Sequence, residues 1–263
     1  AVVTITGIGN YSGTRSVTFS IVGTLSTAEI TLNSGYVTTS GGDSGYSYAY
    51  DGRPATPAVT SVTLGGATLE EGTDKDYTVS YTSNTDAGTA TVNINGVGAY
   101  VGQKATATFT IKQRAISSIQ YTITPTSNTY NGAEIKPTVV IKAQIYRDNG
   151  SGTYTRGYYE LTEGTDYELS YENNTNVGTA KIVVSGKGNF TNAKTISSAY
   201  TISALNLSDS SVNVTVEDAV YDGEAKTPKV VVSTAAGTID SSNYDLAYEN
   251  NVNVGTNTGK VTI

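Results

Sequence analysis

The 263-residue sequence contains no cysteine, histidine, methionine or tryptophan. Because His and Cys are both missing, the sequence excludes Ser-His-Asp and Cys-His nucleophile systems, the usual zinc sites, haem ligation and iron–sulfur clusters. Disulfide bonds are excluded too, so apolar cores must hold the fold together. We therefore expect a chain that is not an enzyme and that carries no cofactor and no catalytic or metal-binding residue.

Positive charge and long apolar runs are also scarce. The formal net charge is −7, which argues against nucleic acid and anionic lipid as partners. No apolar run approaches the roughly 18–20 residues that span a bilayer, so we expect no membrane insertion of this segment. The composition suits an exported bacterial protein, secreted or held at the cell surface.

Three short phrases recur along the chain with a period of about 90 residues, which is the signature of a tandem array. The first is Tyr-x-Gly-x4-Pro, which begins at Tyr50, Tyr130 and Tyr221. The second ends in Gly-Thr, at Gly88, Gly178 and Gly255. The third is Gly-x-Gly-x-aromatic, which ends at Tyr11, Tyr100 and Phe190.

The phase of these phrases predicts four segments. They are 1–21, the C-terminal strands of a truncated repeat; 22–111 and 112–202, two full β-repeats; and 203–263, a β-repeat without its last strands. Both ends fall inside a repeat, so we expect a portion of a longer protein. The joins at Lys112-Gln113-Arg114 and Ser203-Ala204 are short and contain no Pro-rich or Gly-Ser tract. Short joins restrict hinge motion, and we expect an elongated rod.

Alternation with period two predicts the strands. Tyr77-Thr78-Val79-Ser80-Tyr81 places Tyr, Val and Tyr on one face, and phrases beginning at Tyr167 and Tyr244 repeat the pattern. The following strand has small and aliphatic residues at alternate positions, which we expect to face the same core: Ala90, Val92 and Ile94; Ala180, Ile182 and Val184; and Ala1, Val3 and Ile5. No stretch shows a helical apolar period. The sequence predicts an all-β fold of tandem antiparallel sandwiches of immunoglobulin-like size.

The succession of phrases resembles the tandem MBG or YDG-type repeats, grouped with bacterial immunoglobulin-like repeats, of large secreted and cell-surface proteins of Gram-positive gut bacteria. The similarity runs from Tyr-Asp-Gly-x4-Pro through Glu-Gly-Thr-Asp-Tyr (163–167) and Asn-Val-Gly-Thr-Ala (176–180) to Gly-Lys-Gly-Asn-Phe (186–190). It implies a surface stalk or adhesin-type spacer beside other modules. The last segment departs from it, with Asp240-Ser241-Ser242-Asn243 in place of Glu-Gly-Thr-Asp.

Two recurring features admit a functional and a structural interpretation. Gly-x-Gly can cradle phosphate when it opens a helix after a strand; with strand on both sides we interpret it as a bulge or tight turn. The loop carboxylates can bind Ca²⁺ or cap their own loops, and without a D-x-D-x-D-G run we favour capping. These carboxylates are Asp74, Asp76, Glu163, Asp166 and Glu172. No common Lys donor recurs for an isopeptide crosslink.

Unit-specific insertions are where function is usually grafted. The 22–111 segment carries about ten extra residues before its Tyr-Asp-Gly phrase, around 40–48, and the 112–202 segment carries a predicted hairpin tipped by Asp148-Asn149-Gly150. Tyr146, Tyr154 and Tyr158 of this hairpin are the candidate residues for binding a glycan or a protein partner. We favour the structural interpretation, in which the hairpin is an elaborated edge that packs on the neighbouring unit and stiffens the joint.

The sequence therefore predicts a non-catalytic stalk or adhesin-type segment that spaces and displays other modules of the same polypeptide. The alternative is a carbohydrate- or partner-binding module that uses the Tyr-rich loops of the 112–202 repeat. Because the apolar row Val3 and Ile5 would be exposed unless covered, while 203–263 lacks the strands that such a tail supplies, we also expect head-to-tail self-association, in which the tail of one molecule completes the head of another.

Overall fold

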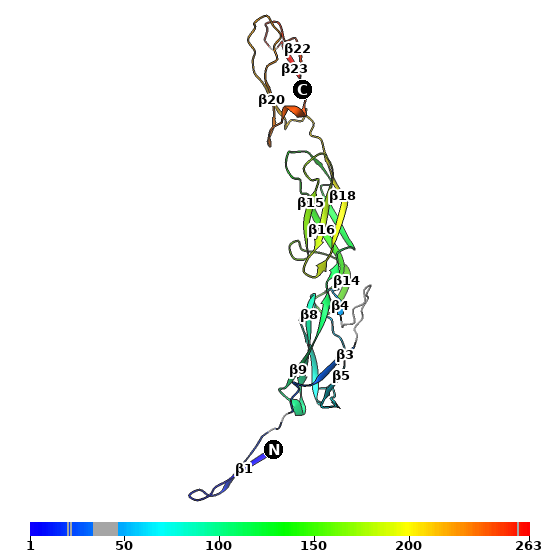
Figure 1. The fold of residues 1–263 in the computed structure, drawn as a ribbon, viewed down its shortest axis with the longest axis vertical. Coiled ribbons are helices and arrows are strands. Elements are labelled where there is room, and N and C mark those ends of the chain that lie inside the picture. Colours follow the sequence, from blue (N-terminus) through cyan, green and yellow to red (C-terminus); the bar gives the residue numbers. More distant parts are fainter. Residues whose placement is uncertain (20, 22, 34–46, 257) are drawn as a thin grey trace. The chain divides into compact units, whose positions relative to one another are not determined.

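The computed structural model describes residues 1–19, 21, 23–33, 47–256 and 258–263. Within these ranges the chain is all-β; apart from strands it forms two 3₁₀ turns, η1 (Gly98–Tyr100) and η2 (Ser241–Asn243), and no α-helix (Figure 1). It divides into two compact units. Unit 1 comprises Ala1–Tyr121, Ile141–Glu168 and Val184–Lys194, and unit 2 comprises Thr122–Val140, Leu169–Val183 and Thr195–Ile263. Their border runs through the 112–202 segment, and the bounds of the four segments stay a prediction.

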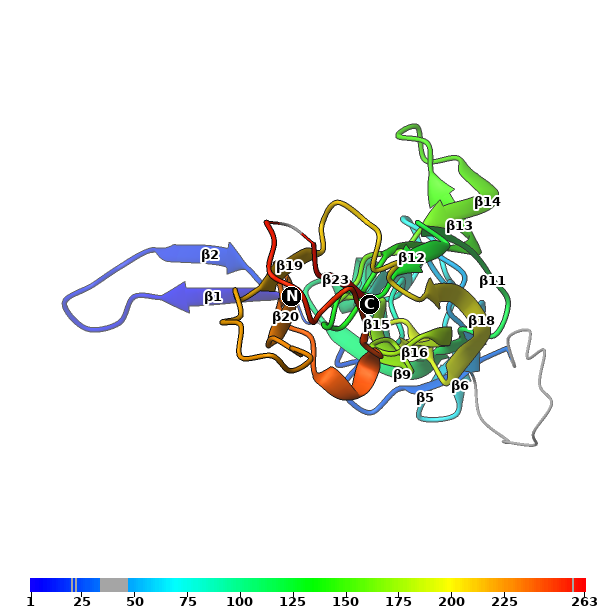
Figure 2. The ribbon, with the colours of Figure 1, turned by 90° about the horizontal axis from the view of Figure 1, so that it is seen from above.

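Unit 1 begins with a hairpin of two antiparallel strands, β1 (Val2–Thr6) and β2 (Thr14–Thr18), seen side by side in Figure 2. Its apolar residues are exposed: Val3 by 45% and Ile5 by 62%. This agrees with the expectation that this row is open unless something covers it.

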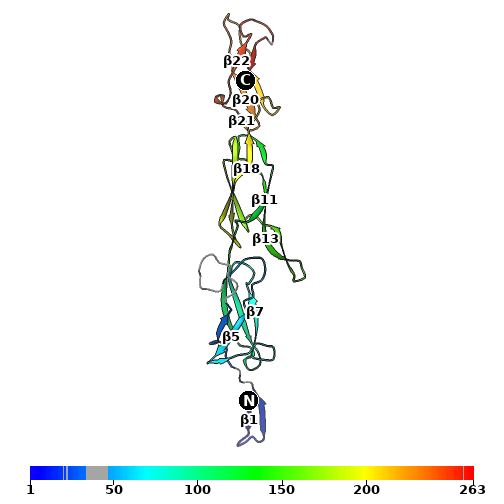
Figure 3. The same cartoon turned by 90° about the vertical axis from the view of Figure 1, so that its right-hand side faces the viewer.

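The 22–111 segment forms two sheets around one core. The first has the order β3-β5-β6, and the second has the order β4-β9-β8-β7. Their bounds are β3 Glu29–Leu32, β4 Ser47–Ala49, β5 Val59–Leu64, β6 Ala67–Thr68, β7 Tyr77–Thr82, β8 Gly88–Gly96 and β9 Lys104–Lys112. Figure 3 labels β5 of the first sheet and β7 of the second.

The core of this segment follows the predicted alternation. Ala90, Val92 and Ile94 of β8 have no exposed surface, while Tyr77 of β7 is 4% exposed. They pack in one cluster with Val62 of the other sheet, as in a β-sandwich. A fully buried aliphatic side chain contributes about 1.5–3 kcal/mol, so this cluster is the main source of stability.

The 112–202 segment repeats this arrangement, and its strands β11, β13, β14 and β18 are longer than their equivalents. Its sheets have the orders β11-β13-β14 and β12-β18-β16-β15, with a short pair β10-β17. Their bounds are β10 Arg114–Ala115, β11 Ile119–Thr124, β12 Ser127–Thr129, β13 Thr138–Asp148, β14 Tyr154–Glu160, β15 Tyr167–Glu172, β16 Gly178–Gly186, β17 Phe190–Thr191 and β18 Ala193–Ser203. The predicted inward residues Ala180, Ile182 and Val184 again have no exposed surface.

The 203–263 segment, in unit 2, has a three-stranded sheet of order β19-β20-β21 and a pair β22-β23. Their bounds are β19 Asn213–Val216, β20 Val230–Thr234, β21 Gly237–Thr238, β22 Ala247–Glu249 and β23 Lys260–Thr262. The predicted strand from Tyr244 is wrong in its first half. Asp240 accepts a hydrogen bond from the backbone of Ser242 and caps η2, the strand begins only at Ala247, and Leu246 is 37% exposed.

The expectation of purely antiparallel sheets also needs correction. Among the described residues, parallel pairing joins β4 with β9, β12 with β18, and β10 with β17. Strand β4 precedes the Tyr-Asp-Gly phrase and pairs with the last strand of its own segment, far along the chain. Period-two alternation gives the faces of a strand but says nothing about its partner or direction, so the sequence could not reveal these pairs.

Candidate functional site

The Tyr-x-Gly phrase is a turn, and at Tyr50 and Tyr130 it follows a parallel edge strand. In its three copies the side chain at the second position accepts a hydrogen bond from the backbone N–H two residues on: Asp51 from Arg53 (2.9 Å), Asn131 from Ala133 (2.9 Å) and Asp222 from Glu224 (3.0 Å). The glycine that follows has a positive φ each time, 91°, 80° and 93°, where residues with a Cβ are strained. The backbone N–H of Tyr50 donates to the Lys112 carbonyl (2.9 Å), as that of Tyr130 does to Ser203 (2.8 Å).

The Gly-x-Gly-x-aromatic phrase is a closed turn between two antiparallel strands. The first glycine donates its N–H to a carbonyl across the turn at 2.8 Å in all three copies: Gly7 to Gly13, Gly96 to Gln103 and Gly186 to Asn192. The second glycine has φ between 55° and 64° in all three. A Cβ at Gly98 or Gly188 would lie 2.7 Å from the carbonyl oxygen of Lys75 or Thr165. The turn interpretation is therefore confirmed, and close backbone approach explains the glycines.

These two phrases meet within unit 1. The Tyr50 ring packs edge-on against Phe190, with centroids 5.6 Å apart at 79°, and Phe190 is only 1% exposed. Beside it, Asn189 Nδ2 donates to Asp86 Oδ1 (2.9 Å), and Asn189 Oδ1 accepts from the backbone N–H of Ala87 (2.7 Å). One turn of the 112–202 segment is thus held by an aromatic contact and two hydrogen bonds to the 22–111 segment.

The 84–87 loop, which bonds Asn189 and which we call the acceptor loop, is hydrogen-bonded to the Tyr-x-Gly turn. Asn84 Nδ2 donates to the Ala55 carbonyl (3.0 Å), and the Ala55 N–H donates back to the Asn84 carbonyl (2.7 Å). The same reciprocal pair joins Asn251 to Lys226 at 2.8 Å in both directions. In the 112–202 segment the Ile135 N–H donates to the Asn174 carbonyl (2.8 Å), but Asn174 Nδ2 has no partner among the described residues. Because the 203–263 segment forms the full pair without a docked turn, the form of the acceptor loop does not depend on the contact.

A second contact lies on the other side of the Tyr-Asp-Gly turn. The backbone N–H of Tyr146 donates to the Asp51 carbonyl (2.7 Å). The Arg53 guanidinium, held by the Asp51 carboxylate, lies 3.9 Å from the centroid of the Tyr146 ring, in cation–π geometry. Gly52 passes so close to the Tyr146 carbonyl that a Cβ at this position would overlap it.

We call this set the Tyr50/Phe190 surface. It consists of Tyr50, Asp51, Gly52, Arg53, Asp86 and Ala87 from the 22–111 segment and Tyr146, Asn189 and Phe190 from the 112–202 segment. The join is tied to it as well: Gln113 Nε2 donates to the Gly188 carbonyl (2.8 Å), and the Arg114 N–H donates to the Asn189 carbonyl (2.9 Å).

Electrostatics keep the Tyr50 phenol protonated. Burial raises the pKa of Tyr50, and the negative charges of Asp166 and Asp86 raise it further. Arg147 and the hydrogen-bonding side chain of Asn189 act in the opposite direction on this pKa. The neutral phenol is the form that packs against Phe190.

The three candidate tyrosines lie on the β13–β14 hairpin, which Figure 2 shows as two adjacent strands. The register pairs Tyr146 with Arg156, Asp148 with Tyr154 and Gln144 with Tyr158, so all three rings are on one face. Tyr158 is 45% exposed, Tyr154 is half-buried, and Tyr146 is engaged by Arg53. The predicted Asp-Asn-Gly tip is present: Asp148 accepts from the N–H groups of Gly150 and Gly152, both at 2.9 Å.

Two of the loop carboxylates considered as Ca²⁺ ligands, Asp76 and Asp166, accept hydrogen bonds from the backbone of their own loops. Asp76 Oδ2 accepts from the N–H of Glu70, and Asp166 Oδ2 accepts from the N–H of Thr162, both at 2.9 Å. Glu172 pairs with Lys181 at 3.6 Å. Across the described ranges no three His, Cys, Asp or Glu side chains converge as a metal site. Among the same residues, no helix is long and apolar enough to cross a bilayer.

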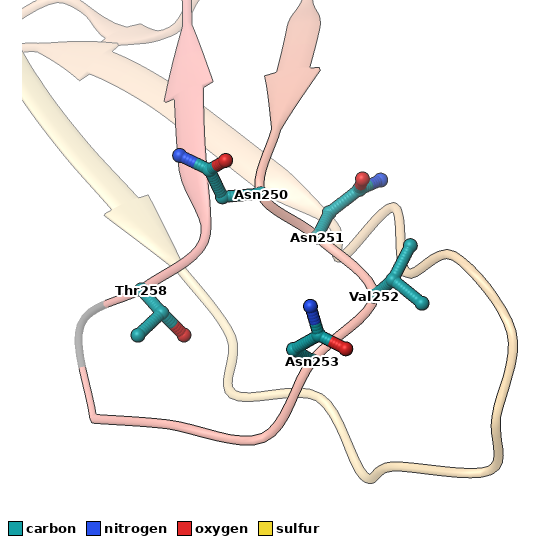
Figure 4. Close-up of a pocket in the computed structure, with 5 residues that line it drawn as sticks. All are labelled: Asn250, Asn251, Val252, Asn253 and Thr258. Atoms are coloured by element: carbon teal, nitrogen blue, oxygen red, sulfur yellow. The ribbon is translucent and has the colours of Figure 1, made fainter.

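Two hollows of the described surface lie at the 173–179 and 250–258 loops, which correspond to the acceptor loop. One, of about 420 Å³, is bordered by Asn250, Asn251, Val252, Asn253 and Thr258. Figure 4 shows the side chains of Asn253 and Thr258 on either side of its open centre. A smaller one, of about 270 Å³, lies at the equivalent loop of the 112–202 segment, beside Asn176 and Val177.

Comparisons with protein-family models, with curated proteins and with solved structures give no match. Sequence analysis missed Asn189, Asp86 and Arg53. The asparagine before the aromatic residue in the 7–11 and 186–190 phrases could have indicated a contact residue. The turn itself requires glycines but no amide side chain at this position, so a recurring asparagine there points to a bond with another part of the protein. Residues 40–46 of the predicted insertion lie outside the described residues, while Ser47 begins β4.

Proposed function

We propose that this chain is a non-catalytic structural segment of a bacterial secreted or cell-surface protein. In it, tandem immunoglobulin-like β-sandwiches space and display other modules of the same polypeptide. The observation that supports this role is the Tyr50/Phe190 surface, where recurring phrases of two predicted repeats bind each other. A contact built from repeated phrases can be made again at each join, which is what a stalk of defined reach needs.

The chemistry of the contact favours stiffness over recognition. An aromatic edge contact contributes about 0.5–1.5 kcal/mol beyond burial, and each net hydrogen bond about 0.5–1.5 kcal/mol. With the two bonds of Asn189, the surface opposes bending by roughly 1.5–4.5 kcal/mol. A short join alone leaves many orientations open. This join is held by backbone and side-chain bonds on both sides, so we infer a semi-rigid rod.

Small-angle X-ray scattering tests this role. The proposal expects a maximum dimension on the order of 100 Å or more, from sandwiches of about 40 Å each. A compact particle with a radius of gyration of about 18–20 Å contradicts it.

A paired variant tests the contribution of the contact itself. Asn189→Ala with Arg53→Ala removes both side-chain attachments and leaves the cores intact, so we expect a broader distribution of interatomic distances. Asn93→Ala, which removes a side-chain bond to Thr82 inside the 22–111 segment and lies outside this contact, is the matched control. Identical scattering from the paired variant and the control would remove the stiffening role.

A second candidate function is binding of a glycan or a surface protein by the β13–β14 hairpin. The observation that favours it is that Tyr158, 45% exposed, shares a face with Arg156 and Tyr154. Tyrosine stacks and donates hydrogen bonds at low entropic cost. A glycan array and affinity electrophoresis test this function: Tyr158→Ala should abolish retention, while Tyr121→Ala, also 45% exposed, should not. Silence of the unmodified protein in both assays excludes the glycan.

A further inference from the structure

The contact between Asn189 and the 84–87 loop defines a donor turn and an acceptor surface, and the chain contains further copies of both. A donor turn presents asparagine followed by an aromatic residue after two glycines. An acceptor surface consists of the Tyr of the Tyr-x-Gly turn and two consecutive loop residues, Asp86 and Ala87 in the observed case. Asp86 accepts through its side chain, and Ala87 donates through its N–H.

The 7–13 turn is a preformed second donor. Its Gly9 has φ 64°, against 59° for Gly188, and its Gly7 N–H closes the turn at the same 2.8 Å as Gly186. Asn10 and Tyr11 occupy the positions of Asn189 and Phe190. Tyr11 is 80% exposed, whereas Phe190 in the docked turn is 1% exposed.

The 203–263 segment holds a second acceptor surface, formed by Tyr221, Asn253 and Val254. Tyr221 is 58% exposed and Val254 is 77% exposed. Asn253 stands where Asp86 stands, and its carbonyl oxygen can accept the same amide hydrogen. The loop is held by the reciprocal Asn251 bonds described above, and the hollow of Figure 4 opens beside Asn253.

The equivalent surface of the 112–202 segment is less open. There the Tyr-x-Gly glycine, Gly132, already faces Ala236 of the 203–263 segment, since a Cβ at Gly132 would lie 3.6 Å from the Ala236 side chain. At Gly223 a Cβ would meet nothing within 4 Å. Of the two acceptors, the surface at Tyr221 is therefore the one that offers unobstructed access.

We propose that the 7–13 turn of a second copy of this chain docks on the Tyr221/Asn253/Val254 surface. Asn10 bonds the Asn253 side chain and the Val254 N–H, while the Tyr11 ring packs against Tyr221. The proposal rests on the docking role proposed above for the Tyr50/Phe190 surface. It differs from completion of one repeat by the strands of another, because it needs no strand exchange. Donor and acceptor are different patches, so the contact is heterologous and builds open chains.

Because the protein has no cysteine, site-specific cross-linking tests the contact directly. Two single variants, Asn10→Cys and Asn253→Cys, are mixed and treated with a short thiol–thiol cross-linker. We expect a mixed dimer, and from the double variant a ladder of oligomers that lengthens with protein concentration. The internal control is Asp86→Cys with Asn189→Cys, which should cross-link within one molecule.

Each outcome decides something. A cross-linked control without any mixed dimer overturns this inference and leaves the proposed function standing. Failure of the control itself overturns the docking geometry that both share. A double variant that closes only on itself, with no ladder, excludes the second copy as the occupant.

Sedimentation velocity of the unmodified chain provides the second measurement. The average mass should rise with concentration, and Asn253→Ala should weaken association about tenfold, the equivalent of one lost contact of about 1.4 kcal/mol. Asn253→Asp, which restores the side chain found at the observed surface, should retain association. A single monomeric boundary at every concentration, or equal association by all variants, contradicts the proposal.

Discussion

Alanine at Gly52 should open the Tyr50/Phe190 surface, whereas alanine at Gly223 should not. Both glycines have nearly the same φ, 91° and 93°, so both substitutions carry the cost of a Cβ in the left-handed region, about 1–2 kcal/mol. Only at Gly52 does the added methyl group overlap a backbone carbonyl, that of Tyr146. The difference between the two variants therefore isolates the contact from the turn.

The expected difference follows from the interactions that must separate. Moving Tyr146 away breaks its N–H bond to the Asp51 carbonyl, about 0.5–1.5 kcal/mol, and its contact with Arg53, about 0.5–1 kcal/mol at an exposed site. Gly52→Ala should then cost about 1–2.5 kcal/mol more than Gly223→Ala.

Hydrogen exchange at the Tyr146 amide is the appropriate assay, because a chain of several segments does not unfold as one two-state unit. The expected cost corresponds to exchange about 5- to 60-fold faster in Gly52→Ala. Gly223→Ala should leave this amide unchanged. Gly132→Ala, where the nearest side chain is at ordinary contact distance, is a further control. Equal protection of Tyr146 in all three variants would refute the reasoning.

Three further predictions concern the tyrosines. Tyr200→Phe removes a hydroxyl that donates to the Ile135 carbonyl at 2.5 Å. We expect the free energy of unfolding to fall by less than about 1 kcal/mol, because the buried Asn174 Nδ2, which has no partner among the described residues, can then bond that carbonyl. A double-mutant cycle with Asn174→Ala, measured by denaturant unfolding, checks this. Raising the pH should destabilise the protein, because the pKa of Tyr50 is raised in the folded state. The contribution of the neutral Tyr50 phenol to the free energy of unfolding is complete below the unfolded pKa of about 10 and is lost as the pH rises from there through the folded pKa. Unfolding midpoints measured across alkaline pH would show this loss. Asp166→Asn should lower the pKa of Tyr50, since the Asp166 charge raises it; an unchanged ring titration by NMR would contradict this.

Inward-facing residues were predictable because a core imposes a strict period of two on each strand. Ala90, Val92 and Ile94 were assigned inward from alternation alone, and all three have no exposed surface. The same rule failed at Leu246, 37% exposed. There residues 244–246 lie outside the sheets although Tyr244 has extended backbone, and alternation predicts burial only where a strand belongs to a sheet that is covered on one face.

Strand partners and the contact surface could not be predicted in the same way. The parallel pairing of β4 with β9 depends on where a distant strand ends, which leaves no mark in the local pattern. The role of Asn189 depends on a carboxylate and an N–H about a hundred residues away in sequence, at Asp86 and Ala87. The turn was foreseeable from its glycines; the surface on which it docks was not.

The three Gly-x-Gly-x-aromatic turns differ in the residue before the aromatic one, and this difference shows which residues the turn itself requires and which only the contact requires. The 96–100 turn has Ala99 where the others have asparagine, yet the Ala99 carbonyl accepts from the Gly23 N–H at 2.8 Å, just as the Asn189 carbonyl accepts from Arg114 at 2.9 Å. The backbone of the turn therefore needs its glycines and its carbonyl but not the amide side chain. In the 186–190 turn the Asn189 side chain bonds Asp86 and the N–H of Ala87 in the neighbouring segment. Under the proposed stalk role, this one side chain adjusts how firmly a join is held, while the backbone bonds that close the turn are unchanged.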